Sequence, residues 1–310
     1  MLALRRKAAG EAEVAEVEEP TPGDGEVLVE LRYASVNPFD LQVLRGEIGN
    51  PNRVLTLGAE GTGYVDGEPV QVSGAGLGAG RDGTFAPFVV APTAAVRALP
   101  TDADLATVAT LGVAGRTAWR AVHQLAEVGP SDVVLVLGAT GGVGTYAVQL
   151  ARQVGALVLA HTGNADKIPY LEGLGAETVL AREGSELASL LRGADVSVVL
   201  DPLGGDYVAE LAAVIAPRAR IVTYGILAGE HSRWNLGALY RKGLRVFGTS
   251  GSTTTAEESA QSLKGAWDAV LDGVISLDLR TLPLSGSAQA FDLLSERRVT
   301  GKLLIEMPVA

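Results

Sequence analysis

The 310-residue sequence contains no cysteine and only three histidines. The absence of cysteine excludes disulfide bonds, thiolate nucleophiles and cysteine-ligated metals. His123, His161 and His231 are widely separated along the chain, whereas a zinc ion needs three or four converging ligands. The sequence therefore predicts that the protein holds neither a catalytic nor a structural zinc ion.

Long apolar runs and an excess of positive charge are missing as well. No stretch reaches the roughly eighteen apolar residues that a membrane span needs, and no long apolar region follows the N-terminal segment 1–7. With 25 Lys and Arg against 36 Asp and Glu, the formal net charge is −11, which argues against nucleic acid or an anionic membrane as the main partner. The sequence therefore predicts a cytoplasmic protein that acts on a small molecule.

A glycine cluster that ends an apolar run is the most informative feature that is present. The run 133–137 leads into Gly138, and a helix-like stretch from Tyr146 to Val154 follows the cluster. This order is typical of a buried parallel strand, a tight turn and a helix N-terminus, which together bind a pyrophosphate. The alternative is a turn that only permits close packing of the helix on the strand. The predicted cofactor contacts are Ala139, Thr140, Gly141, Gly142, Val143 and Gly144.

The end of the next strand indicates which dinucleotide binds. That strand is predicted over 156–161, and the first acidic residue after it is Asp166. Sites that prefer NAD usually place a carboxylate at the strand end to bind the ribose 2′-hydroxyl. Small polar groups and a lysine suit a 2′-phosphate instead, so we predict NADPH. The predicted contacts are Thr162, Gly163, Asn164 and Lys167; the alternative for Lys167 is an ordinary solvated helix residue.

Strands and helices alternate through the second half of the chain. The first hundred residues are mostly β, with period-two alternation over 26–33, and a helical pattern extends over 102–128. Six strands then alternate with helices, which is the pattern of a doubly wound parallel sheet in an α/β protein. Further helices are expected over 256–271 and 287–297, before a closing strand at 302–306. The six predicted strands are 132–138, 156–161, 177–180, 195–201, 219–224 and 244–248.

Short motifs occur in a specific order along almost the whole chain. They are Asn37-Pro38-Phe39-Asp40, the Gly-x-Glu-x-x-Gly element 58–63, Thr117-Ala118-Trp119, the glycine cluster 138–144, Leu174-Gly175-Ala176, Asp201-Pro202-Leu203-Gly204-Gly205, Thr223-Tyr224-Gly225 and Thr300-Gly301-Lys302. This ordered set resembles the medium-chain dehydrogenase/reductase superfamily, and within it the zinc-independent branch of quinone oxidoreductases, zeta-crystallin and enoyl reductases. Where zinc-dependent relatives carry histidine in a Gly-His-Glu motif, this chain has Ala59.

The resemblance implies a mostly-β GroES-like catalytic domain over 1–112 and a Rossmann domain for NADPH over 113–248. For 249–310 it implies a helix on the cofactor domain and then a return to the catalytic domain. Family members often pair their cofactor domains through sheet edges, so a homodimer is expected. The matching motifs imply further cofactor contacts at Thr117, Asp201, Pro202, Tyr224, Gly225 and Lys302. The family tyrosine that contacts the 2′-phosphate is missing here, and Arg182 is predicted to replace it by its charge.

Direct hydride transfer is the simplest reaction for a site without a metal or a thiolate. A quinone or an α,β-unsaturated carbonyl suits it because the conjugated oxygen takes up charge as hydride adds, whereas saturated ketones or alcohols more often need zinc. The predicted catalytic residues are Asn37, Asp40 and Tyr224, with the Asn37 amide as one donor to the developing oxyanion. The alternatives are a turn residue for Asn37, a helix cap for Asp40 and a core residue for Tyr224.

Two other functions are compatible with the sequence. The first is an enoyl-thioester reductase of fatty-acid or polyketide metabolism, although the acidic chain shows no obvious basic rim for CoA or a carrier protein. The second is a protein that binds NADPH as a sensor or structural component and catalyses no reaction.

Overall fold

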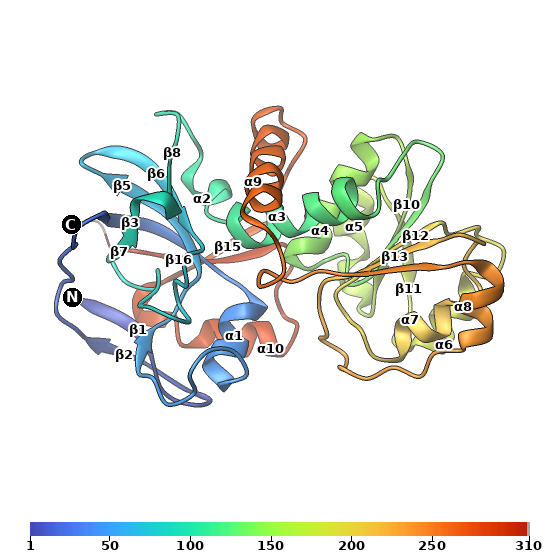
Figure 1. Ribbon diagram of the computed structural model, residues 1–310, viewed down its shortest axis with the longest axis horizontal. Coiled ribbons are helices and arrows are strands. Elements are labelled where there is room, and N and C mark those ends of the chain that lie inside the picture. The colour runs from blue at the N-terminus through green and yellow to red at the C-terminus, as the bar shows by residue number, and fades with distance from the viewer. Residues whose placement is uncertain (309–310) are drawn as a thin grey trace. The chain divides into compact units, whose positions relative to one another are not determined.

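Two compact units make up residues 1–308, the part of the chain that this computed structural model describes (Figure 1). Unit 1 comprises Met1–Ala114 and the chain from Leu277 on, and unit 2 comprises Gly115–Ser276. The domain boundary expected after residue 112 lies beside the first of these limits. The expected C-terminal segment 249–310 is divided between the two units after Ser276.

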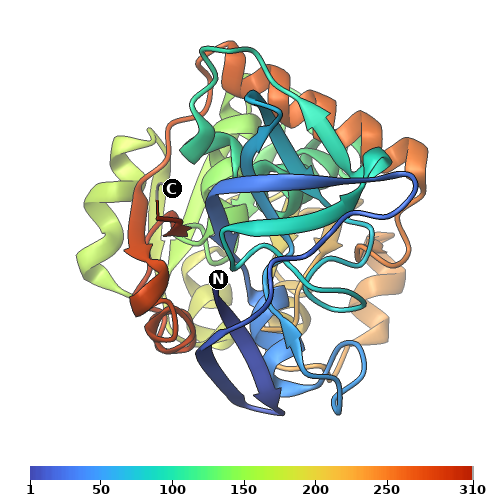
Figure 2. The same ribbon diagram turned by 90° about the vertical axis from the view of Figure 1, so that its left-hand side faces the viewer.

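Unit 1 is built mainly on antiparallel β-structure, which can be followed in Figure 2. Its larger sheet has the order β15-β16-β3-β5-β6-β8, with β7 also paired to β3, and its smaller sheet has the order β2-β1-β4. The strands are β1 (Leu2–Ala8), β2 (Glu11–Glu16), β3 (Glu26–Val36), β4 (Leu55–Thr56), β5 (Glu60–Val65), β6 (Glu68–Ser73), β7 (Phe88–Pro92), β8 (Val96–Ala98), β15 (Leu279–Pro283) and β16 (Lys302–Glu306). The helical elements are α1 (Pro38–Arg45), η1 (Thr93–Ala95), α2 (Leu105–Val108), η2 (Leu111–Gly115), η5 (Leu284–Gly286) and α10 (Gln289–Ser295).

The register of three strands in unit 1 brings together residues that are distant in the sequence. Strand β16 runs antiparallel to β3 with Leu303 opposite Val36, and β5 runs antiparallel to β3 with Gly61 opposite Ala34. The residues that precede Leu303 and Gly61 therefore lie near the point where β3 ends and α1 begins. A buried apolar core fixes this register; its members include Val29, Leu31, Val43, Leu57, Phe85, Phe291, Leu303 and Ile305.

Unit 2 is a doubly wound parallel sheet with the strand order β11-β10-β9-β12-β13-β14. Its strands are β9 (Val133–Val136), β10 (Leu157–Thr162), β11 (Glu177–Leu180), β12 (Val198–Asp201), β13 (Arg220–Thr223) and β14 (Arg245–Gly248), all within or next to their predicted ranges. Its helical elements are α3 (Arg116–Trp119), η3 (Arg120–Leu125), α4 (Gly142–Gln153), η4 (Ala165–Lys167), α5 (Ile168–Gly173), α6 (Gly184–Leu190), α7 (Asp206–Leu211), α8 (Leu236–Lys242) and α9 (Ala256–Leu271). Strand β14 is an edge strand with Val246 47% exposed, and the expected homodimer stays a prediction.

The helical pattern predicted over 102–128 is confirmed as a series of helical elements. It is divided into α2, the π-helical turn η2, α3 and the π-helical turn η3. In η2, the Val113 N–H donates to the carboxylate of Glu60 at 2.8 Å. Val113 lies in the first turn of the helical stretch 111–125, where backbone N–H groups have no intrahelical acceptor, and the carboxylate of Glu60 supplies one. The hairpin β1–β2 and strand β15 were also not predicted.

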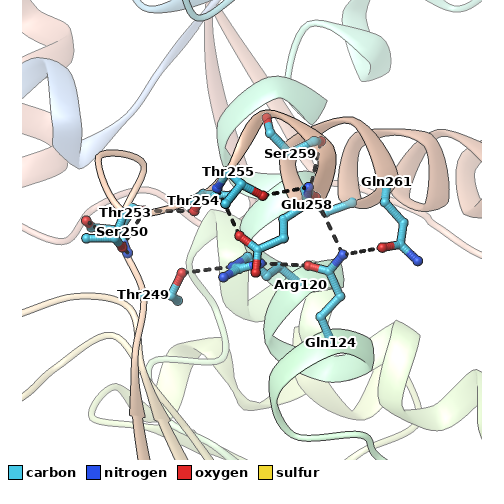
Figure 3. Close-up of polar contacts among 11 residues, drawn as sticks. Arg120, Gln124, Thr249, Ser250, Thr253, Thr254, Thr255, Glu258, Ser259 and Gln261 are labelled. Atoms are coloured by element: carbon cyan, nitrogen blue, oxygen red, sulfur yellow. Dashed lines mark hydrogen bonds and ion pairs between the residues drawn. The ribbon is translucent and has the colours of Figure 1, made fainter.

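Helix α9 is attached to the helices of unit 2 by a polar network (Figure 3). The Arg120 guanidinium pairs with Glu258 at 3.1 Å and also donates to Thr249 at 3.1 Å. The Glu258 carboxylate in turn accepts from the Thr255 N–H and completes a capping box at the start of α9. These contacts attach the start of α9 to unit 2, and hydrogen bonds between Gln149 and Ser276, at 3.0 and 2.8 Å, attach the segment after it. No helix within residues 1–308 has the length and apolar character of a membrane span.

Candidate functional site

The predicted glycine turn, residues 138–144, lies at the C-terminal end of β9, where the strand order of the sheet reverses. Strand β10 lies on one side of β9 and β12 on the other, and ligands of doubly wound sheets bind at such a switch point. Gly138 has a φ of 55°, and the Ala139 N–H donates to the carbonyl of His161 at 3.0 Å. Helix α4 begins at Gly142, and the first N–H groups of any helix have no intrahelical acceptor. The turn therefore presents backbone donors and the positive end of a helix dipole at the position where a pyrophosphate binds.

The glycines of this turn have different roles. A Cβ on Gly144 would lie 2.6 Å from the Gly138 carbonyl oxygen and 2.7 Å from the Ala139 Cα, so Gly144 is needed for close packing of α4 on the turn. A Cβ on Gly141 would meet only the Gly138 oxygen, at 3.4 Å, which is an ordinary contact. Ala139 and Thr140 are buried, whereas Gly141, Gly142 and Val143 are partly accessible. Packing thus requires a glycine at position 144, whereas packing inside the protein does not require one at position 141.

The loops that follow β12 and β13 pack against each other. The Asp201 carboxylate accepts from the N–H groups of Leu203 at 2.8 Å and Gly204 at 3.0 Å, and from the Thr223 hydroxyl at 3.1 Å. Burial raises the pKa of Asp201, and these hydrogen bonds oppose that rise. The carboxylate therefore shapes the loop, and its contact to a cofactor stays a prediction. The predicted residues Pro202 and Gly225 lie against each other, because a Cβ on Gly225 would be 2.6 Å from the Pro202 carbonyl oxygen.

Tyr224 follows β13 at the same end of the sheet. Its hydroxyl is buried and has no hydrogen-bond partner among residues 1–308. Buried polar groups in proteins are nearly always paired, so an orphaned phenol at a strand end is a group that a ligand can satisfy. Burial raises the pKa of Tyr224, and the nearby Asp201 raises it further, so the phenol stays protonated and able to donate.

The end of β10 carries no carboxylate, as predicted. The Thr162 hydroxyl accepts from the Asn164 N–H at 3.2 Å, and the Asn164 side chain accepts from the Asp166 N–H at 3.0 Å, so both side chains shape the loop. Gly163 is exposed at the turn. Lys167 is half-buried in η4, and burial lowers the pKa of its ammonium group.

Two further predicted contacts lie elsewhere in unit 2. Arg182 is exposed just after β11, where its N–H donates to Glu186 at 2.8 Å. Thr117 is half-buried in α3, a helix that packs against α4. Neither position conflicts with a contact to a cofactor, and both assignments stay predictions.

Unit 1 contains a buried polar cluster of Asn37, Asp40, Glu60 and Lys302. The Lys302 ammonium donates to the Asn37 side-chain oxygen at 2.7 Å and lies 4.0 Å from the Glu60 carboxylate. The Asn37 amide donates to Glu60 at 2.8 Å and to the Ser35 carbonyl at 3.2 Å. The side chains of Lys302 and Glu60 are 3% and 0% exposed. The β16–β3–β5 register described above is what brings these groups together.

This cluster changes the roles predicted for three residues. Both protons of the Asn37 amide are used inside the protein, so they are not available to an oxyanion. Asp40 accepts from the Asn37 N–H at 2.8 Å at the start of α1, which is the helix-cap alternative. Lys302 was predicted to contact the cofactor, but its ammonium serves the cluster and the Val36 carbonyl, at 3.1 Å. Glu60 was not predicted as a member of this cluster, although the Gly-x-Glu-x-x-Gly element contained it.

Burial dominates the electrostatics of the cluster. It raises the pKa of Asp40 to about 7, against two opposing hydrogen bonds from backbone N–H groups. It also raises the pKa of Glu60 and lowers that of Lys302, while the attraction between these two groups opposes both shifts. The charges of Glu60 and Lys302 therefore stabilise each other in a buried site that disfavours either charge alone. Within residues 1–308, no three His, Asp or Glu side chains come together in a way that would hold a metal ion.

Comparisons with known proteins agree with this two-unit architecture. A model of the alcohol dehydrogenase GroES-like domain matches residues 23–80, and a model described as zinc-binding dehydrogenase matches residues 142–270. Prostaglandin reductase-3 of Bos taurus is 27% identical over 316 residues, which cover 93% of this chain and 83% of that protein. A mycocerosic acid synthase-like polyketide synthase of Mycobacterium tuberculosis is 30% identical over 96% of this chain, but the chain spans only 15% of its length.

A solved structure is also similar to this chain over nearly its whole length. A thermostable alcohol dehydrogenase from Pyrobaculum aerophilum superimposes with a TM-score of 0.84 and 30% sequence identity, covering 99% of each chain. A GroES-like β-unit combined with a doubly wound sheet and a glycine turn at its switch point defines a dinucleotide-binding dehydrogenase fold. The chain belongs to the medium-chain dehydrogenase/reductase superfamily of oxidoreductases.

Proposed function

We propose that the protein is an NADPH-dependent, zinc-free reductase of quinones or α,β-unsaturated carbonyl compounds. The observation that carries this proposal is the glycine turn at the switch point of the unit 2 sheet, with Gly141 partly accessible and not required for packing. When bound there, NADPH supplies the hydride. The chain supplies the backbone donors for the pyrophosphate and the groups around the strand ends.

The end of β10 supports NADPH over NADH. A carboxylate there would bind a ribose 2′-hydroxyl and repel a 2′-phosphate, and this chain has none between Thr162 and Asn164. Lys167 and the exposed Arg182 provide positive charge near the ends of β10 and β11. The proposal of a reaction without zinc is supported by Ala59, which occupies the place of the histidine in the motif of zinc-dependent relatives.

An acceptor panel tests the proposed activity. We expect reduced nicotinamide to be consumed with quinones or simple enones, with kcat/KM at least about tenfold higher for NADPH than for NADH because a charge-assisted phosphate contact is gained. Treatment with EDTA should leave the rate unchanged. Strong inhibition by EDTA would contradict the zinc-free reaction.

The same panel distinguishes the other functions. The match to a polyketide synthase over nearly the whole chain favours an enoyl-thioester reductase as the second candidate. Turnover of enoyl-CoA compounds alone would support that candidate. Tight NADPH binding with no turnover of any acceptor would support a sensor or structural protein.

Tyr224→Phe tests the orphaned hydroxyl. Because this hydroxyl has no partner within the described chain, its removal should leave the thermal unfolding temperature unchanged or slightly raised. If NADPH or the acceptor satisfies the hydroxyl, kcat/KM should fall by roughly fivefold or more, the value of one hydrogen bond. Tyr240→Phe is the matched control, since Tyr240 is 84% exposed. Equal kinetics in both variants and the wild type would remove Tyr224 from the site.

A further inference from the structure

His161 connects the glycine turn to the neighbouring strand. The side chain lies in β10 and is only 3% exposed. Its Nδ1 accepts a hydrogen bond from the Gly138 N–H at 3.3 Å, and its Nε2 lies 2.9 Å from the carbonyl oxygen of Ala181. A backbone N–H only donates and a carbonyl only accepts, so these two contacts together require a neutral ring with its proton on Nε2.

The surroundings of the ring hold it in this orientation. The ring packs against Tyr207 of α7 with a centroid distance of 5.7 Å, and the Tyr207 hydroxyl donates to the Arg182 carbonyl. The charged group that acts on the ring is Glu186 of α6. The glycine turn itself carries no titratable side chain. Burial lowers the pKa of His161, while the Ala181 carbonyl and Glu186 oppose that shift.

We propose that neutral His161 is a positioning residue for the cofactor, which fixes the turn 138–144 relative to the end of β11. The proposal rests on the proposed function, because it concerns the same dinucleotide site. Gly138 occupies the left-handed region, at a φ of 55°, and the imidazole accepts from its N–H. The same ring donates to Ala181, the residue before Arg182, so one side chain sets the spacing between the pyrophosphate turn and the strand end predicted to contact the 2′-phosphate.

The geometry makes cofactor affinity sensitive to protonation of the ring. A second proton, on Nδ1, would place an N–H donor against the Gly138 N–H and remove the acceptor of that group. Affinity should therefore be complete while the ring is neutral and should fall as the pH drops through its lowered pKa. This direction is the opposite of that expected for a histidine that binds a phosphate as a cation.

Two substitutions separate positioning from simple packing. Asparagine places its side-chain oxygen near the position of Nδ1 and retains an acceptor for Gly138, whereas leucine fills the space without one. We expect His161→Leu, which loses both contacts, to raise the Kd for NADP⁺ at pH 8 by about tenfold. His161→Asn, which keeps the Gly138 contact and loses the Ala181 contact, should raise it by only about threefold. His123→Leu is the matched control, because His123 is a half-buried histidine of unit 2 whose Nε2 has no partner within residues 1–308.

Calorimetric titration with NADP⁺ from pH 8 to pH 5 supplies the second readout. The wild-type Kd should rise more steeply at low pH than the Kd of His161→Asn. Both proteins bind the same ligand, so protonation of the 2′-phosphate cancels in the ratio of the two Kd values at each pH. Parallel curves, or an asparagine variant no better than leucine, would overturn the proposal. If the leucine variant does not fold, the asparagine curve alone decides. A wild type that fails to bind at pH 8 would instead refute the proposed function.

Discussion

Gly141→Val should weaken NADP⁺ binding by at least about a hundredfold while the protein remains folded. The reason is that the backbone of Gly141 has a φ of −82° and a ψ of 172°, which any residue can adopt. Its Cβ would make only an ordinary contact inside the protein, at 3.4 Å from the Gly138 oxygen. The branched side chain would occupy the accessible side of the turn, where the pyrophosphate must approach the backbone.

A second glycine in the same turn provides the contrast for this experiment. Gly144→Val would push its Cβ to within 2.6 Å of the Gly138 carbonyl oxygen, so α4 could not pack on the turn, and the unfolding temperature should drop sharply. Thermal unfolding and calorimetric titration give an unfolding temperature and a Kd for NADP⁺ for each of the two variants. A Gly141→Val protein that binds NADP⁺ like the wild type would show that this turn does not hold the cofactor.

Lys302→Met should destabilise unit 1 by about 3–5 kcal/mol, because it leaves the Glu60 carboxylate buried without its cation. The Asn37 oxygen and the Val36 carbonyl would also lose their donor. Denaturant unfolding followed at neutral pH measures the free-energy difference. Because the polar cluster belongs to unit 1, the loss should appear even without a cofactor.

A second substitution identifies the cause of this loss. Combining Lys302→Met with Glu60→Gln removes both charges, so the double variant should be more stable than the sum of the two single changes predicts, by at least about 1 kcal/mol. Lys264→Met is the matched control, since the side chain of Lys264 is 67% exposed and its ion pair with Asp268 should contribute less than about 1 kcal/mol. Equal losses at Lys302 and Lys264 would show that the buried pair carries no special stability.

The sequence predicted those parts of the fold that depend on local pattern. The apolar runs of the central strands β9, β10 and β12 are buried in a parallel sheet, and the alternation of short strands with helices locates all six strands. The helical pattern over 102–128 located the helical elements from α2 to η3, but it did not show that the carboxylate of Glu60, distant in the sequence, accepts from the Val113 N–H. Strand β15 was missed because its pairing partner β16 follows it by about twenty residues, and local alternation alone did not mark it.

The candidate site likewise contains residues that local pattern predicts and residues whose roles depend on contacts distant in the sequence. The glycine turn is a local feature, and its residues lie where the sequence placed them. The roles of Asn37 and Lys302 depend on the register of β16 against β3, which motif spacing does not reveal. His161 was visible only as the end of a predicted strand, because its partners Gly138 and Ala181 belong to two other segments of unit 2.

Titration of the wild-type protein with NADPH and with NADH, followed by nicotinamide fluorescence, is the most direct measurement of whether the turn at the end of β9 is a dinucleotide site. We expect saturable binding of NADPH and binding of NADH that is at least about tenfold weaker, in keeping with the missing carboxylate after β10. A protein that produces no signal and no heat with either nucleotide would contradict the assignment of this turn and of the proposed reaction.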